Sequence, residues 1–303
     1  MTRRRFGWRE FPPAAGSFVM ATGIVSVGLH TVGFEVLSWG LLGLAGAVWL
    51  LLAVDFFVRL VGDFGRWRVE AGKPPALTGV AATTVLGTRI SLLGWHWLAA
   101  ALLAIGAAAW PVLLIAVLGH WQRRLPGVAF LVCVSTQGLA VLSVTLSIAG
   151  MGDWLAPVAL ALWVFGLCLY AVALWRFDIR QVWTGAGDQW VASGALAISA
   201  LAVAKLVAAH RWDDDVLRAA TLVVLGLCLA WYAVLLVAEA VRPRKHYDIR
   251  RWATVFPLGM TAVATLRTGA ALGISYLHPL GGALLAIAVA AWVLASAGLV
   301  GSR

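Results

Sequence analysis

Three cationic side chains stand inside long apolar stretches of this 303-residue chain, Arg89, Lys205 and Arg267, and no acidic residue shares those stretches. A positive charge in hydrocarbon is costly and usually faces a water-filled pathway. Each cation follows the start of its stretch by thirteen to fifteen positions, which places all three at one depth, roughly 20 Å in. This arrangement predicts a vestibule that attracts anions. The alternative is that each side chain extends to lipid headgroups or pairs with the acids of residues 213–215.

The stretch that holds Arg267 also holds Phe256 and Pro257, in the run RWATVFPLGM at 251–260. Arg267 follows Phe256 by eleven positions, or three helical turns plus about 20°, so the two side chains share a face, about 16 Å apart. Pro257 removes a backbone hydrogen bond and bends a helix. A phenyl ring at this bend could plug a narrow pathway. The alternative is a phenylalanine that packs against a neighbouring helix.

The elements that must position these residues are membrane helices. Hydrophobic residues make up 62% of the chain and charged residues 12%, with a mean hydropathy of +0.92. These values are typical of an integral membrane protein. We expect a tail at 1–13 and one transmembrane domain at 14–301, because about 20 apolar residues cross a bilayer. The apolar stretches lie at 14–32, 37–60, 76–94, 95–118, 127–149, 154–175, 190–209, 216–241, 252–274 and 279–300.

Apart from the three cations named above, most basic residues fall on one side of these ten stretches, at 3–9, 59–73, 123–124, 176–180, 242–251 and 303, and the opposite side carries only Arg211 and Arg218. Positive loops are retained in the cytoplasm, so we expect both termini to be cytoplasmic, in a bacterial plasma membrane. The net charge of +10 then reflects topology and lipid headgroups, and no nucleic acid partner is expected. Asp55 and Glu239 lie near the cytoplasmic side, with Arg59 and Arg242 as expected partners.

Serine and threonine concentrate in the odd-numbered stretches, and tryptophan concentrates in the even-numbered ones. Hydroxyls need partners or water, whereas bulky rings suit lipid. We therefore expect an all-α fold of five helical hairpins, with odd helices in an inner ring around a central pore and even helices in an outer ring. The alternative is a solid bundle in which small residues only permit close packing. The candidate pore-lining residues are Thr22, Ser26, Thr84, Thr88, Gln137, Ser199, Thr261 and Thr265.

No pattern in the sequence supports an enzyme. The chain has no HExxH-like or paired-aspartate motif, and its three cysteines form no CxxC pair. We therefore expect no catalytic residue, no metal site and no cofactor, and an intramembrane enzyme is a remote alternative.

Two motifs carry a family resemblance: FPPAAGSFVMATGIVSVG at 11–28 and RWATVFPLGM at 251–260. The chain resembles the tellurite-resistance/dicarboxylate transporter family, which includes the plant guard-cell slow anion channels and the yeast malate and sulfite transporters. The resemblance implies a homotrimer with a pore in each protomer, blocked midway by a phenylalanine, which corresponds to Phe256, beside the Pro257 kink. Several inner helices here have glycine where the family has a kink proline: Gly23, Gly87, Gly138 and Gly194. The short tail lacks the long regulatory region of the plant channels.

The substrate is left open among small inorganic and carboxylate anions, because pore diameter cannot be deduced from sequence. No odd-numbered stretch offers a carboxylate for a proton relay. This favours a passive anion channel. The alternative is a proton-coupled or facilitative carrier of C4-dicarboxylates or sulfite.

Overall fold

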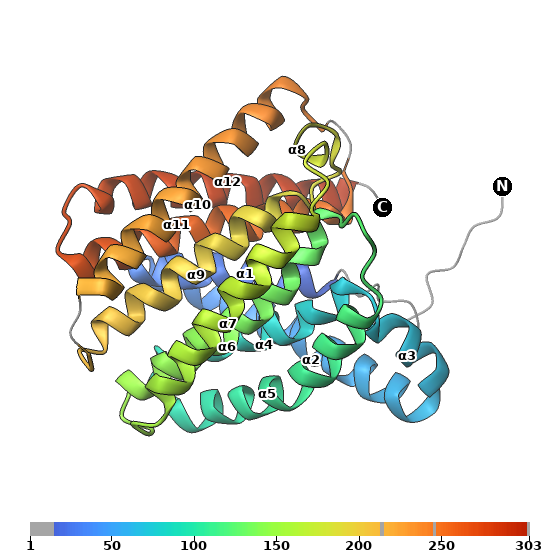
Figure 1. The fold of residues 1–303 in the computed structure, drawn as a ribbon, viewed down its shortest axis with the longest axis horizontal. Helices are drawn as coiled ribbons and strands as arrows, with labels where there is room; N and C mark the ends of the chain where they lie inside the picture. Colours follow the sequence, from blue (N-terminus) through green and yellow to red (C-terminus); the bar gives the residue numbers. More distant parts are fainter. Residues whose placement is uncertain (1–14, 213–214, 245–246, 302–303) are drawn as a thin grey trace.

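The computed structural model describes residues 15–212, 215–244 and 247–301 (Figure 1). The tail at 1–13 and the acids Asp213 and Asp214 therefore lie outside the described residues. The described chain is helical and contains no strand. Its ten main helices are α1 (Ala15–Thr31), α2 (Glu35–Gly62), α4 (Thr78–Ser91), α5 (His96–Gly119), α6 (Leu131–Ile148), α7 (Leu155–Arg176), α9 (Trp190–Ala208), α10 (Asp215–Val241), α11 (Trp252–Leu272) and α12 (Leu277–Gly301).

Five short helical segments join or precede these helices: α3 (Phe64–Ala71), α8 (Gln181–Thr184), and the 3-10 turns η1 (Pro74–Leu77), η2 (Gly127–Phe130) and η3 (Ile249–Arg251). Each 3-10 turn leads into a buried helix. The α-helix within the predicted stretch at 76–94 is shorter than the stretch, because the 3-10 turn η1 extends to Leu77 and α4 begins only at Thr78 and ends at Ser91.

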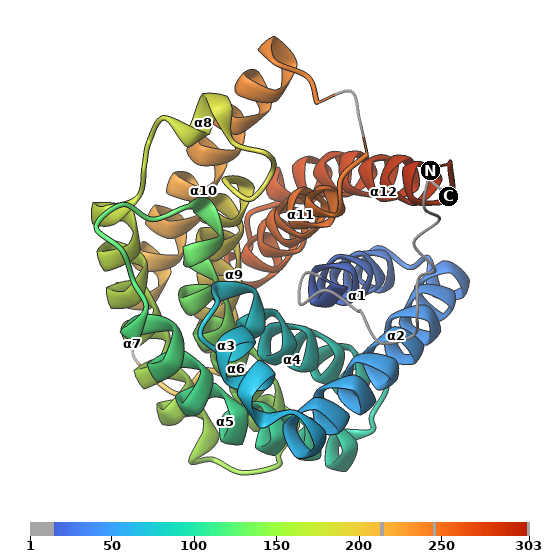
Figure 2. The same cartoon turned by 90° about the vertical axis from the view of Figure 1, so that its right-hand side faces the viewer.

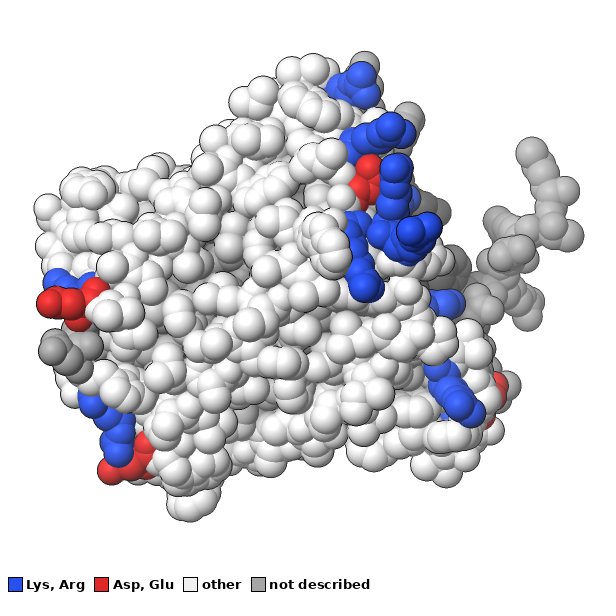
Figure 3. All heavy atoms as spheres, viewed as in Figure 1, with Lys and Arg blue, Asp and Glu red and all other residues white. Residues whose placement is uncertain are grey.

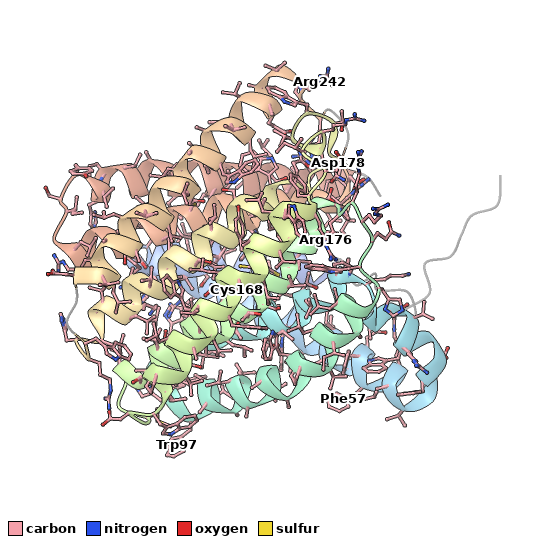
Figure 4. All side chains as sticks on the ribbon, in the orientation of Figure 1. Phe57, Trp97, Cys168, Arg176, Asp178 and Arg242 are labelled. Atoms are coloured by element: carbon pink, nitrogen blue, oxygen red, sulfur yellow. The ribbon has the colours of Figure 1, made fainter. Side chains whose placement is uncertain are left out.

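Eight helices in the described residues are long and apolar enough to cross a membrane. The two main helices below this limit are α1 and α4, with 17 and 14 residues. Large apolar side chains such as Trp97 and Phe57 point outward from the bundle (Figure 4). Lys and Arg gather at the end of the bundle that carries α3 and α8, and the broad middle is uncharged (Figure 3). We call this the basic end.

Short turns at the opposite end connect the helices in pairs: α1 to α2, α4 to α5, α6 to α7, α9 to α10 and α11 to α12. Each turn contains a residue with positive φ, a conformation that ends a helix and suits glycine. These residues are Gly33, Gly94, Gly150, His210 and Gly273. We call this the turn end.

Burial separates the first helix of each pair from the second. In α6, α9 and α11, 78% to 94% of the membrane-length segment is buried, against 11% to 33% in the second helices. The five first helices contact one another in the cyclic order α1, α4, α6, α9, α11 and back to α1. In Figure 2 they lie inside α2, α5, α7, α10 and α12.

A side-chain contact fastens the second helix of each pair to the first helix of the next pair, and we call these contacts latches. Four are indole N–H hydrogen bonds, and the fifth is a cysteine beside a threonine. They are Trp49 to Thr83 Oγ1 at 2.8 Å, Trp110 to Thr136 Oγ1 at 3.0 Å, Trp163 to the Ser199 carbonyl at 3.0 Å, Cys228 Sγ beside Thr261 Oγ1 at 3.5 Å, and Trp292 to Thr22 Oγ1 at 3.0 Å.

The latches predict that loss of one indole N–H lowers the free energy of unfolding. Trp110→Phe keeps an aromatic ring but leaves Thr136 without its donor, so we expect a loss of ~1 kcal/mol in unfolding free energy. Trp97→Phe is the matched control, because Trp97 is 81% exposed. Thermal unfolding in detergent should lower the Tm of the first variant only. Equal shifts would mean that the latch contributes nothing.

Candidate functional site

A cavity of about 460 Å³ opens at the basic end. All five buried helices, or the turns that precede them, contribute to its wall. Its charged lining residues are Asp188, Asp248 and Arg250. The Arg250 guanidinium lies 2.8 Å from Asp248 and holds the pKa of that carboxyl below its usual value through its hydrogen bond. We call this space the basic-end cavity.

A second cavity lies toward the turn end and again takes its wall from all five buried helices. Its volume is about 20 Å³, which holds scarcely more than one water molecule. Most of the lining is aliphatic. The polar exceptions are the hydroxyls of Thr84 and Thr88 and the cations Lys205 and Arg267. We call this the turn-end cavity.

Phe256 lines the basic-end cavity and is 2% exposed. Met260, Val263 and Arg267, which follow it on α11, line the turn-end cavity. Their spacing of four, seven and eleven residues from Phe256 places all four side chains on one face of α11. One face of α11 thus contributes to both cavities.

Lys205 and Arg267 come from adjacent helices, α9 and α11, and face the same cavity. Among the residues that the structure describes, neither forms an ion pair with a carboxylate. Arg267 Nη2 donates a hydrogen bond to Thr31 Oγ1 at 3.1 Å. Within the described part of the chain, the two cations of the turn-end cavity thus have no carboxylate as an ion-pair partner.

The structure places Arg89 apart from Lys205 and Arg267, because it lines neither cavity. Its guanidinium is fully buried and faces α2, where Nη2 lies 3.6 Å from Glu35 and Nε donates to Ser38 at 3.1 Å. Depth along the helix did not predict this direction: Arg89 lies five positions after Thr84, a cavity-lining residue, or about 140° around the helix. Glu35, which lies between the apolar stretches 14–32 and 37–60, is the first residue of α2.

Only two of the eight predicted pore-lining residues, Thr84 and Thr88, line either cavity. The other six line neither cavity: Thr22, Ser26, Gln137, Ser199, Thr261 and Thr265. Gln137, for example, donates to the Trp163 carbonyl at 2.9 Å, and Ser26 exchanges hydrogen bonds with Ser38.

The hydroxyls need no water because most donate to their own helix. Ser199, Thr261 and Thr265 each donate to the carbonyl four residues earlier, at 2.7 to 2.8 Å. A hydroxyl satisfied in this way can sit in a dry interface. Hydroxyl content therefore identified the buried helices but not the side of each helix that faces the cavities.

An ion-pair network fixes the start of α11. Arg244 contacts Glu239 with three hydrogen bonds of 2.8 to 3.0 Å and also donates to Thr254 at 2.9 Å. Arg242, the expected partner of Glu239, instead lies beyond the end of α10 (Figure 4). The expected Arg59–Asp55 pair forms, at 2.9 Å.

Sequence reasoning missed the aliphatic lining of the turn-end cavity. Ile198 and Leu201 precede Lys205 by seven and four residues, and Met260 and Val263 precede Arg267 by the same intervals. The signal was present: helical spacing counted back from each intramembrane cation gives these residues.

Comparison with known families gives one match. The family model SLAC1, described as voltage-dependent anion channel, matches residues 10–300. No curated protein matches the chain.

Proposed function

The chain belongs to the SLAC1 family of voltage-dependent anion channels, and from that membership we propose that it passes small anions along the axis of its five buried helices. The family is one of integral membrane channels and transporters and is not an enzyme family. The chain is accordingly an integral membrane protein of the anion channel and transporter class.

We extend the proposal to the membrane topology. All ten main helices cross the bilayer, including the short α1 and α4. The pair partners of these two helices, α2 and α5, are long enough to cross, and a short turn joins the two helices of each pair. The basic end faces the cytoplasm, since positive residues are retained there. The turn end faces outward, and the membrane is a bacterial plasma membrane.

The observation that supports the proposed pathway is the pair of cavities lined by one face of α11, with Phe256 on the wall of the larger one. Both are bounded by the same five helices, so they share one axis. The Phe256 ring closes this axis, and Pro257, which supplies no N–H to the helix, marks the bend from which the ring projects. Phe256 is thus the proposed gate.

Lys205 and Arg267 supply the charge selectivity of this pathway. Two cations without a carboxylate in the turn-end cavity attract anions and repel cations. The aliphatic wall around them offers no carboxylate for proton exchange. This favours passive conduction over the proton-coupled or facilitative carriage of C4-dicarboxylates or sulfite, which is the alternative function.

The oligomer that we propose is a homotrimer with one pathway in each protomer. Its support is the family resemblance, together with the position of the pathway inside a single chain. Such a trimer would conduct through three separate pores and would need no axial channel between subunits.

The test is anion flux into liposomes that contain only this protein, with a halide-sensitive or nitrate-sensitive dye inside. We expect flux that follows the electrochemical gradient and requires no pH gradient. Flux that appears only with an opposing proton gradient would favour the carrier. The absence of any anion flux from correctly folded protein would remove the proposal.

A further inference from the structure

Gly194, in the second turn of α9, provides the surface against which the Phe256 ring lies. A Cβ atom added at Gly194 would stand 3.3 Å from Phe256 Cε1 and 2.9 Å from Pro257 Cγ. The second distance is too short for carbon atoms in contact. The backbone of α9 therefore approaches both the gate residue and its kink more closely than any other amino acid would permit.

The presence of glycine here is costly for the helix itself. Glycine in a helix interior is less stable than alanine by about 1 kcal/mol, and Gly194 lies four residues inside α9. A residue with that intrinsic disadvantage at a fully buried position indicates that space, rather than backbone conformation, determines the choice. Its φ is not positive, so the glycine is not needed for an unusual turn.

Other buried glycines also allow close helix approach, but they meet different neighbours. A Cβ at Gly23 would lie 2.9 Å from Val85 Cγ1, and one at Gly259 would lie 2.9 Å from Ile24 Cγ2. Among the glycines in the described residues, Gly194 is the one whose added Cβ would meet the Phe256 ring. Substitutions at different glycines can therefore disturb helix packing with or without disturbing the contact with the Phe256 ring.

We propose that Gly194 is a positioning residue for the gate: the bare backbone of α9 accepts the edge of the Phe256 ring and so stabilises the closed position. The inference rests on the proposed function, since it presupposes that the ring closes the pathway. A methyl group at position 194 would stand 3.3 Å from Phe256 Cε1, which is tighter than an ordinary contact, so the ring would have to shift by a few tenths of an ångström from this position.

The experiment measures chloride flux in proteoliposomes for Gly194→Ala, Phe256→Ala and the double variant. Displacing a ring from its preferred rotamer alters its population by roughly two- to tenfold, so we expect Gly194→Ala to raise basal flux by about that factor. On the Phe256→Ala background the same change should have no effect, because the ring is absent. A flux change of equal size on both backgrounds, or no change on the wild-type background, overturns the inference.

Two controls separate this role from general loosening. Gly87→Ala, in α4, introduces a contact of 2.7 Å with Leu142 Cδ2, which lines neither cavity, and should leave flux unchanged. Gly226→Ala, in α10, meets no atom within 4 Å and tests helix propensity alone. An equal gain in flux from Gly87→Ala would refute a specific role for Gly194.

If Gly194→Ala folds poorly, the Tm values of the single and double variants still test the inference. The added methyl group contacts both the Phe256 ring and Pro257, so Phe256→Ala should restore only part of the Tm that Gly194→Ala loses. If removal of the ring restores none of it, the clash is with Pro257 alone and the inference fails. Failure of the gate is distinguishable, because Phe256→Ala by itself would then leave flux at the wild-type level, whatever residue occupies position 194.

Discussion

Replacement of Phe256 by alanine should raise anion flux by roughly tenfold or more, which corresponds to a barrier lowered by at least ~1.4 kcal/mol, while the Tm stays near that of the wild type. The ring borders the cavity of about 460 Å³ at the basic end. Truncation therefore enlarges an existing space and joins it to the turn-end cavity, and leaves no closed void. Flux and thermal unfolding should be measured on the same preparation.

Phe130→Ala is the matched control for this variant. Phe130 is fully buried and packs against Tyr170 and Phe177, with ring centroids 5.1 and 5.4 Å away. Its truncation should cost ~3–5 kcal/mol and should not raise flux. If Phe256→Ala behaves in the same way, Phe256 is a packing residue. If it is stable but passes no more anion, the barrier lies at the turn-end cavity, with a volume of only about 20 Å³.

The double variant Lys205→Gln with Arg267→Gln should lower anion flux by roughly tenfold at low ionic strength, because charged pathways raise local anion concentration and entry rates by at least that factor. Both side chains line the turn-end cavity. The loss should shrink as salt increases, since salt screens the field at the mouth of the pathway. Flux should be measured across a series of ionic strengths at a fixed anion gradient.

Arg89→Gln supplies the contrast to that double variant. Arg89 pairs with Glu35 and Ser38 on α2 and lines neither cavity. We expect it to lower the Tm, because Glu35 and Ser38 lose the guanidinium that they contact, and to leave flux and its salt dependence unchanged. A salt-dependent loss of flux with Arg89→Gln, comparable to that of the double variant, would show that all three cations act on the anion.

Hydropathy alone was sufficient to locate the helices. Each of the ten apolar stretches contains a main helix, with boundaries that differ by a few residues. Boundaries shifted where local chemistry competes with hydropathy, as at Pro74 and Pro75, which start a 3-10 turn before α4. The division into buried and exposed helices also followed from sequence, because hydroxyls and indoles have different solvation needs.

The orientation of individual side chains was harder to predict. Arg89 and Lys205 have the same depth and the same helix parity, yet one faces α2 and the other faces a cavity. The difference is angular and depends on Glu35, which reaches Arg89 only in the folded chain. Likewise, Thr261 donates to its own helix while it meets Cys228, so its polarity says nothing about water nearby.

The latches have a mechanical consequence. The latches run from each helix pair to the next, and the last one returns from Trp292 to Thr22. They therefore form a closed ring of contacts that resists widening of the bundle. Dilating the bundle would strain several of these links together, each worth ~0.5–1 kcal/mol, whereas swinging one phenyl ring aside strains none. Lateral tension in the bilayer acts on the outer helices, and the ring of latches opposes their separation. We therefore expect membrane tension to have little effect on the width of the pathway between the five buried helices.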